Sequence, residues 1–295
     1  MAEPSVQPIS DKSGGRPERR RRVGIALGAG GAKGIAHISM LEALDELGVR
    51  PHCISGSSIG AVIGSLYASG LSARAIKEKA ENLTVTKRDT VRSVLHDRKI
   101  GKWMEMIDAD FRHSGLLKSE AVMTGLYEGV SSSTFEELAT PLKVVATDFW
   151  ERRAVVLESG PLKPAVQASM ALPGVFTPVE LDGRVLIDGG TVNPVPFGLL
   201  TDSCDIVIAV DINSGSPTDT GKVPGYFDTI FGSVQIFQQA IVEREIRAHP
   251  PDIYIKPDLR GFRTLQFHKA DEIYRQVQPA KQELKRKLGA MLETK

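Results

Sequence analysis

Two consecutive strand–turn–helix units near the N-terminus constrain the fold of this chain more than any other feature. Residues 23–27 form a short apolar run, and apolar residues then recur at helical spacing from Ile35 to Leu47. The pattern repeats where a strand-like segment at 51–55 leads through a glycine turn into an apolar helix at 61–68. Two such units in succession favour a parallel sheet with helices on its faces. We therefore expect an α/β fold with three α/β/α layers and a mainly parallel central sheet.

Later segments extend this pattern. Short runs rich in β-branched residues predict strands at 142–146, 154–157, 185–187 and 206–210, and the first two are expected to pair with each other. A helix is expected at 72–83, capped by Ser72.

Two amphipathic helices are predicted near the C-terminus, and we expect their apolar stripes to face the core rather than lipid. The first stripe comprises Phe227, Ile230, Phe231, Val234, Phe237 and Ile241, and the second comprises Ile273, Val277, Ala280, Leu284, Leu288 and Met291.

The domain organisation follows from length and composition. A chain of 295 residues is long enough for one α/β domain with a sizeable core, which we place at 23–295. Residues 1–22 lack apolar periodicity and predict a flexible basic extension. Residues 86–118 are net basic, contain aromatic and methionine side chains, and predict an insertion or lid. Residues 226–295 form the expected helical C-terminal part.

Composition excludes several classes of protein. Apolar residues make up 41% of the chain and charged residues 25%, which is typical of a globular protein. The formal net charge is only +1, and no nucleic-acid-reading motif accompanies the basic extension, so we expect no nucleic-acid partner. The longest near-apolar stretch, at 59–68, is about half of the roughly 20 residues that a spanning helix needs.

The location and the absence of a metal are inferred from side-chain chemistry. No apolar signal segment follows the N-terminal arginines, so the sequence predicts no secretory leader. Cys53 and Cys204 are the chain's two cysteines, and we expect buried thiols in a reducing, cytoplasmic compartment. No cluster of histidine, cysteine or carboxylate has ligand spacing, so we predict no metal and no cofactor.

A Gly-x-Ser-x-Gly pentapeptide spans Gly56 to Gly60 with Ser58 at its centre. It stands where a predicted strand turns into a predicted helix, which is the context of a nucleophile elbow. In such an elbow the serine occupies a strained turn, and side chains at the two glycine positions would collide with neighbouring backbone. The pentapeptide therefore marks Ser58 as a candidate nucleophile.

A glycine-rich loop runs from Gly28 through Gly30, Gly31 and Lys33 to Gly34, directly after the first predicted strand. Backbone amides of such a loop, at the start of a helix, bind an anion, either a phosphate or an oxyanion. A dinucleotide fingerprint would need glycine where Lys33 stands. A P-loop would need serine or threonine where Gly34 stands.

Asp188, Gly189 and Gly190 follow the predicted strand at 185–187. A carboxylate at a strand end, followed by two glycines, can be approached closely by another loop. An isolated Asp-Gly-Gly is most often a plain turn. Together with the elbow and the glycine loop, however, it completes the parts needed for acyl transfer: a nucleophile, an oxyanion site and a base.

No histidine occupies a position that would complete a Ser-His-Asp triad. Each histidine is expected to be structural or exposed, including His37, which lies inside a predicted helix: His37, His52, His96, His113, His249 and His268.

The glycine loop, the elbow at Ser58 and the Asp188 motif, in that order, resemble the patatin-like phospholipase family, especially its bacterial lysophospholipase-like and neuropathy-target-esterase-like members. The segment from Ala168 to Pro178 is also similar to that family's approach to its aspartate. The resemblance covers roughly residues 23 to 212.

This resemblance implies a patatin-like fold and a Ser-Asp dyad. Ser58 would be the nucleophile, Asp188 the base, and the amides of Gly30 and Gly31 the oxyanion hole. Lys33 occupies the family's basic loop position. Ala29 departs from the glycine of many members, but it keeps the amide donor.

The expected activity is hydrolysis of phospholipid or lysophospholipid acyl esters. A free aspartate is a poor base for serine, so burial or a short hydrogen bond is required. Three alternatives stay open: an acyltransferase or a thioesterase with the same dyad, and a non-catalytic phosphate- or nucleotide-binding module. The basic extension and residues 86–118 fit peripheral docking to an anionic membrane and a solvated surface equally well.

Overall fold

The computed structural model describes residues 21–81, 120–213, 223–262, 264 and 266–293. All but the last two residues of the predicted basic extension lie outside the described residues. The predicted insertion or lid at 86–118 also lies outside them.

An eight-stranded sheet forms the centre of the described fold. Its strands are β1 (Val23–Leu27), β2 (Cys53–Ser57), β3 (Leu142–Asp148), β4 (Arg153–Leu157), β5 (Val179–Leu181), β6 (Arg184–Asp188), β7 (Ile206–Val210) and β8 (Ile253–Ile255). The order is β5-β6-β3-β2-β1-β7-β8, with β4 paired to β3 outside this path. Strands β3, β2, β1, β7 and β8 are parallel, whereas β4 and β6 run antiparallel to β3 and β5 runs antiparallel to β6.

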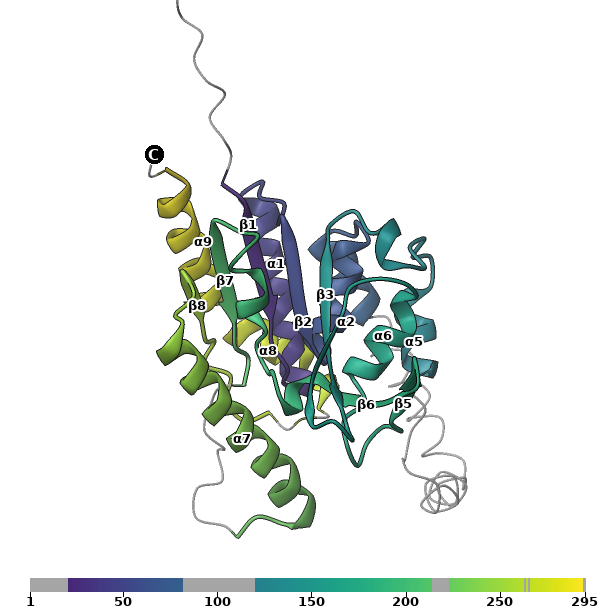
Figure 1. Ribbon diagram of the computed structural model, residues 1–295. Coiled ribbons are helices and arrows are strands. Elements are labelled where there is room, and N and C mark those ends of the chain that lie inside the picture. The colour runs from purple at the N-terminus through teal and green to yellow at the C-terminus, as the bar shows by residue number, and fades with distance from the viewer. Residues whose placement is uncertain (1–20, 82–119, 214–222, 263, 265, 294–295) are drawn as a thin grey trace, which may run out of the picture.

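Helices cover both faces of this sheet (Figure 1). The α-helices are α1 (Ala36–Glu46), α2 (Ile59–Ala68), α5 (Glu120–Tyr127), α6 (Leu162–Ser169), α7 (Tyr226–Ala248), α8 (Ala270–Gln276) and α9 (Gln278–Glu293). Residues 73–81 are also helical, and Ser72 caps them by accepting a hydrogen bond from the amide of Ala75. Short 3-10 turns include η1 (Gly31–Ile35), η3 (Gly189–Thr191) and η4 (Phe197–Leu200).

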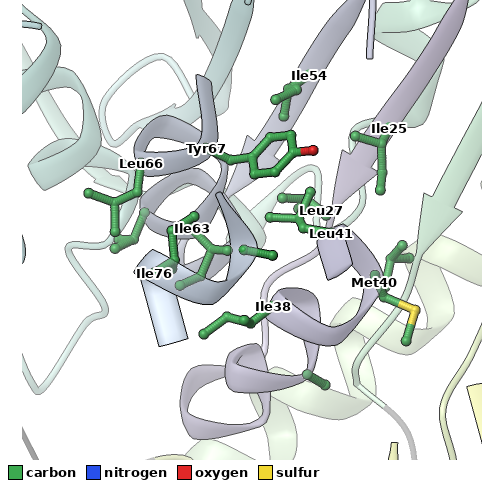
Figure 2. Close-up of a cluster of buried hydrophobic side chains, with 14 of the residues drawn as sticks. Ile25, Leu27, Ile38, Met40, Leu41, Ile54, Ile63, Leu66, Tyr67 and Ile76 are labelled. Carbon is green, nitrogen blue, oxygen red and sulfur yellow. The ribbon is translucent and has the colours of Figure 1, made fainter. Parts of the chain in front are cut away.

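The side-chain alternation of β1 explains the layers. Ile25 and Leu27 point to one face, where they join the main core with side chains of α1 and α2 (Figure 2). Ala26 points to the other face and packs in a smaller cluster with Val242 of α7. Because β1 is buried on both faces, its sequence is continuously apolar, as expected for a central parallel strand. The predicted three-layer α/β fold is confirmed.

The predicted elements differ from the observed ones mainly at their ends. The strand predicted at 51–55 is observed at 53–57, because Gly56 and Ser57 continue the pairing with β3 despite their lack of bulk. The second predicted C-terminal stripe is buried as expected except for Met291, which is half-buried. The stripe is divided between α8 and α9 at Val277. Pro279 lies in the first turn of α9, where its missing amide is tolerated. Strands β5 and β8 were not predicted.

The prediction that the apolar stripe of α7 faces the core is wrong. Phe237 is 64% exposed and Ile230 is 40% exposed, whereas Gln238 and Val242 are buried. The helix therefore packs on the sheet and on η3 through a narrow side that is offset from its apolar stripe. Among the described helices, none is long and apolar enough to cross a membrane.

Candidate active site

Ser58 occupies a strained turn between β2 and α2. Its backbone angles are φ 55° and ψ −125°, outside the regions that a non-glycine residue adopts without strain. Surrounding hydrogen bonds hold this conformation. The Ser58 amide donates to Oγ of Ser169 at 2.9 Å, and the Ser58 carbonyl accepts from the amides of Ala61 and Val62 at the start of α2. The side chain is half-buried, which leaves its hydroxyl partly accessible.

The two glycines of the pentapeptide allow this turn to pack closely, Gly60 against β1 and Gly56 against the start of α2. A Cβ atom on Gly60 would lie 2.0 Å from the carbonyl oxygen of Leu27, and one on Gly56 would lie 2.7 Å from the amide nitrogen of Ala61. Neither approach is possible for a residue with a side chain unless backbone moves. The strand-to-helix setting of the pentapeptide, predicted from sequence, is present in the structure.

Asp188 lies at the end of β6, with its carboxylate beside Ser58. The Ser58 hydroxyl donates a 2.5 Å hydrogen bond to Oδ2 of Asp188, and the amide of Gly190 donates a 2.7 Å hydrogen bond to Oδ1. The backbone of Asp188 is held from both sides, because its amide donates to the carbonyl of Ala171 and its carbonyl accepts from Oγ1 of Thr147. Both carboxylate oxygens are therefore oriented.

The environment of Asp188 makes it a stronger base than a free aspartate. The residue is only 2% exposed, and burial raises the pKa of its carboxyl to about 6, although the hydrogen bonds from Ser58 and Gly190 act in the opposite direction. A carboxylate activates serine only when it is buried or accepts a short hydrogen bond. The structure has both.

The glycine loop follows β1 and is fixed by three of its own amides. Within the described residues, Gly28, Ala29 and Ala32 donate to the carbonyls of Val210, Pro194 and Thr264. Gly30 and Gly31 are the loop residues whose amides have no backbone acceptor in that part of the chain. These are the two amides expected from sequence to bind an oxyanion.

Glycine is required at Gly31 for two reasons. Its φ of +58° is one that side-chain-bearing residues rarely adopt, and a Cβ atom there would lie 2.3 Å from the carbonyl oxygen of Thr264. The loop therefore has a shape that no other residue type at Gly31 would preserve.

His37 fixes the other end of the loop. Its ring is fully buried in α1, and Nε2 lies 2.7 Å from the carbonyl oxygen of Gly28. Burial lowers the pKa of His37 to about 4, so the ring is neutral near pH 7 and Nε2 donates to Gly28. His37 is thus structural, as expected, but its contact with the loop was not predicted.

The three motifs converge at one place. The loop lies against the elbow, since a Cβ atom on Gly34 would lie 2.2 Å from Cγ1 of Ile59. The loop also lies against the aspartate motif, since a Cβ atom on Gly190 would lie 2.6 Å from Cβ of Ala29. Gly189 is equally close-packed, with its Cβ position 2.0 Å from the carbonyl oxygen of Val145. The chain thus places a hydroxyl, a carboxylate and a turn of amides side by side.

Lys33 is buried beneath the loop rather than exposed to a ligand. Burial lowers the pKa of its ammonium group, and the charge of nearby Asp211 opposes this effect. Asp211 is itself buried, accepts a 2.7 Å hydrogen bond from the hydroxyl of Tyr254, and lies 3.5 Å from Nζ of Lys256. The basic position of the loop therefore belongs to a buried polar cluster at the end of β7.

Ser169 was missed as a site residue. It lies in the segment from Ala168 to Pro178 that resembles the family, but its contact with Ser58 joins residues 111 positions apart. No local pattern reports such a contact. Among the described histidines, none hydrogen-bonds to Ser58 or Asp188. Groups of side chains able to hold a metal ion are likewise absent from the described residues.

Comparison with known proteins shows the family of this chain. Residues 25–201 match the family profile described as Patatin-like phospholipase. An uncharacterized NTE family protein of Mycobacterium tuberculosis is 37% identical over 193 residues, covering 65% of this chain and 49% of that protein. Lysophospholipase nte1 of Aspergillus fumigatus is 26% identical over 280 residues, covering 86% of this chain and 17% of that protein.

The fold is also found in a solved structure. VipD from Legionella pneumophila superposes with a TM-score of 0.52 at 14% identity, covering 91% of this chain and 67% of that chain. The present chain spans about half the length of the mycobacterial relatives that it matches. The family profile covers more than half of the present chain and includes the glycine loop, Ser58 and Asp188. The chain therefore belongs to the patatin-like phospholipase family.

Proposed function

We propose that this chain hydrolyses the acyl esters of phospholipids or lysophospholipids with Ser58 as nucleophile and Asp188 as general base. The observation that carries the proposal is the 2.5 Å hydrogen bond from the Ser58 hydroxyl to a buried carboxylate. A desolvated carboxylate with its pKa near 6 accepts a proton more readily than a free aspartate, while still being ionised at pH 7.

The first half of the proposed reaction acylates the enzyme. Oγ of Ser58 attacks the ester carbonyl carbon as its proton passes to Oδ2 of Asp188, giving a tetrahedral intermediate. When the intermediate collapses, the bond to the leaving alcohol breaks and Asp188 returns the proton to that alcohol oxygen. Ser58 then carries the acyl group as an ester.

The second half releases the fatty acid. A water molecule gives a proton to Asp188 as its oxygen attacks the acyl-Ser58 carbonyl, and collapse of this intermediate returns the proton to Ser58. The amides of Gly30 and Gly31 are proposed to donate to the oxyanion in both halves, since the other loop amides have backbone acceptors among the described residues. Loss of one such donor typically costs about 3 kcal/mol of transition-state stabilisation.

The substrate class is a proposal supported by family membership and by the name of the Aspergillus relative, a lysophospholipase. Acyl transfer to an acceptor other than water, and cleavage of thioesters, would use the same dyad. A non-catalytic phosphate-binding role is less well supported, because it does not explain the hydrogen bond between Ser58 and the buried Asp188 carboxylate. We also propose that the protein acts in the cytoplasm and meets membranes peripherally.

A fluorophosphonate probe tests the nucleophile. We expect the purified chain to form a covalent adduct at Ser58, located by peptide mass spectrometry, and Ser58→Ala to form none. Ser39→Ala is a matched control, because Ser39 is a fully buried serine on α1, outside the three motifs. If the intact protein reacts no faster than Ser58→Ala, the hydrolase assignment is wrong. Fatty-acid release from a panel of phospholipids, lysophospholipids and acyl thioesters then identifies the substrate.

A further inference from the structure

The turn between β3 and β4 presents two aromatic rings to solvent. Trp150 is 73% exposed and Phe149 is 47% exposed, and their rings meet edge to face with centroids 4.9 Å apart. We call residues 149–152 the aromatic turn. Large exposed aromatic side chains that lie together are unusual on a water-facing surface and typically mark a contact site.

The aromatic turn is held in this shape by a buried carboxylate. Asp148 is 3% exposed, and its Oδ1 accepts hydrogen bonds from the amides of Trp150, at 3.1 Å, and Glu151, at 3.0 Å. The amide of Phe149 donates to the carbonyl of Val185 on β6. The backbone of the aromatic turn is therefore fixed by contacts with both β3 and β6.

The strand register places the aromatic turn at the same edge of the sheet as the candidate active site, where the parallel strands have their carboxyl ends. The turn lies farther out than Ser58 along this direction. Ser57, beside the nucleophile, pairs with Val145, and β3 runs parallel to β2. From Val145 the strand continues through Asp148 before the turn begins, a rise of roughly 10 Å. The aromatic turn also shares a hollow of about 430 Å³ with Ile187, Thr191 and Val192, which flank Asp188 in sequence.

We propose that the aromatic turn inserts Phe149 and Trp150 into the headgroup region of a phospholipid bilayer and so seats the carboxyl ends of the parallel strands on the lipid surface. This inference rests on the proposed function, since a substrate embedded in a bilayer has to be reached from the membrane surface.

The composition of the turn favours lipid over a protein partner. Tryptophan and phenylalanine are the side chains that bury well at the membrane–water boundary, and exposed Arg152 and Arg153 stand beside them, where guanidinium groups can pair with lipid phosphates. Glu151 is the one acidic residue of the aromatic turn.

Fluorescence tests the insertion directly. The sequence contains two tryptophans, so Trp103→Phe leaves Trp150 as the single reporter. On vesicles of phosphatidylcholine with phosphatidylglycerol, we expect Trp150 emission to move to shorter wavelength and to be quenched when bromine atoms are placed high on the acyl chains. Two results would overturn the proposal: protein that is bound to these vesicles with unchanged Trp150 emission, or protein that does not co-sediment with them.

Variants separate docking from chemistry. We expect Phe149→Ser with Trp150→Ser to weaken vesicle binding and vesicle hydrolysis by about tenfold or more, while hydrolysis of a water-soluble short-chain ester persists. Leu292→Ser is the matched control. Leu292 is 38% exposed on α9. It lies at the edge of the sheet opposite the candidate active site, because the carbonyl of the adjacent Met291 accepts a hydrogen bond from Arg21, just before β1 begins. This variant should bind and hydrolyse vesicles normally.

The outcomes are distinguishable. Vesicle binding that is equal in the double variant and the intact chain contradicts the aromatic-turn anchor, whatever the activity. If the intact chain self-associates and the double variant does not, while vesicle binding is unchanged, the turn is a protein contact instead. If the intact chain binds vesicles through Trp150 but hydrolyses neither ester, the proposed function fails while the docking inference stands.

Discussion

The hydroxyl of Ser58 and the carboxylate of Asp188 are joined by a 2.5 Å hydrogen bond between residues 130 positions apart in sequence. The serine is held in a strained backbone conformation and the aspartate is almost wholly buried. The strained backbone of Ser58 and the burial of the Asp188 carboxylate are each unfavourable for folding. They occur together beside the glycine loop. Strain and desolvation of this kind concentrate at sites that perform chemistry.

The first prediction concerns the pH dependence of hydrolysis. Asp188 can accept the Ser58 proton only when it is ionised, and burial raises its pKa to about 6. We therefore expect kcat/KM for a soluble ester to be constant above pH 7, to fall to half near pH 6, and to drop about tenfold for each further pH unit. A profile governed by a group titrating near 4 would show that burial does not raise the pKa of the catalytic carboxyl.

The second prediction is that Asp188→Asn removes activity and stabilises the fold. The folded-state pKa of about 6 lies above the ordinary 3.8, so the folded chain binds the proton more tightly, and the free energy of unfolding falls as pH rises from about 4 to 6. This difference corresponds to roughly 3 kcal/mol at most. Asparagine can accept from Gly190 and donate to the Ser58 hydroxyl, which keeps both contacts.

Urea unfolding at two pH values measures this effect. Above pH 7 we expect Asp188→Asn to have a higher free energy of unfolding than the intact chain. Near pH 4 the gap should close, because Asp188 is then protonated in the folded state. A gap of equal size at both pH values would mean that repacking, rather than ionisation, causes it.

The third prediction concerns Ser169, whose Oγ accepts from the amide of Ser58 at 2.9 Å. In Ser169→Ala this amide loses its acceptor at the strained turn, which costs about 1–3 kcal/mol. We expect kcat to fall by about tenfold or more with little change in KM, since the nucleophile is misplaced while substrate binding is not altered. Steady-state kinetics on a soluble ester measures both constants.

Ser39→Ala controls for the removal of a buried hydroxyl. Ser39 is as buried as Ser169, and its Oγ has no hydrogen-bond partner within the described residues. This variant should keep full activity and lose no stability. Equal losses in the two variants would show that the Ser169 contact has no special role.

Much of the fold could be predicted because its signals are local. The apolar runs of β1 and β7 coincide with the observed strands, since buried central strands need apolar residues on both faces. The two glycine turns could also be predicted locally. Close backbone approach at Gly60 and Gly31 requires glycine, and these glycines belong to short motifs in the sequence. Strands β5 and β8, with three residues each, are too short to stand out from their surroundings.

The remaining features depend on tertiary packing. The stripe of α7 has the periodicity of a core-facing helix, but Gln238 is buried because it hydrogen-bonds with Asn213 beside the end of β7. The spacing of apolar residues cannot show that a partly polar side of the helix packs against the rest of the protein. The sequence motifs predict that Ser58 and Asp188 act as a pair. Their hydrogen bond and the contact with Ser169 form only when the fold brings β2, β6 and α6 together.

The last prediction separates backbone strain from loss of the loop's shape. Gly31 and Gly48 both have positive φ, +58° and +66°, so alanine at either position costs about 1 kcal/mol or more in backbone energy. At Gly48 nothing lies within 4 Å of the added Cβ, whereas at Gly31 it would lie 2.3 Å from the Thr264 carbonyl oxygen.

Only Gly31→Ala should therefore displace the two loop amides. We expect this variant to lose activity by about a hundredfold or more, comparable with removal of an oxyanion donor. Gly48→Ala should lose a similar amount of backbone stability but keep its activity. Thermal unfolding, with fluorophosphonate labelling rates, distinguishes the two effects. If both variants label equally fast, the glycine loop does not stabilise the oxyanion, and the proton transfer between Ser58 and Asp188 would have to supply the rate by itself.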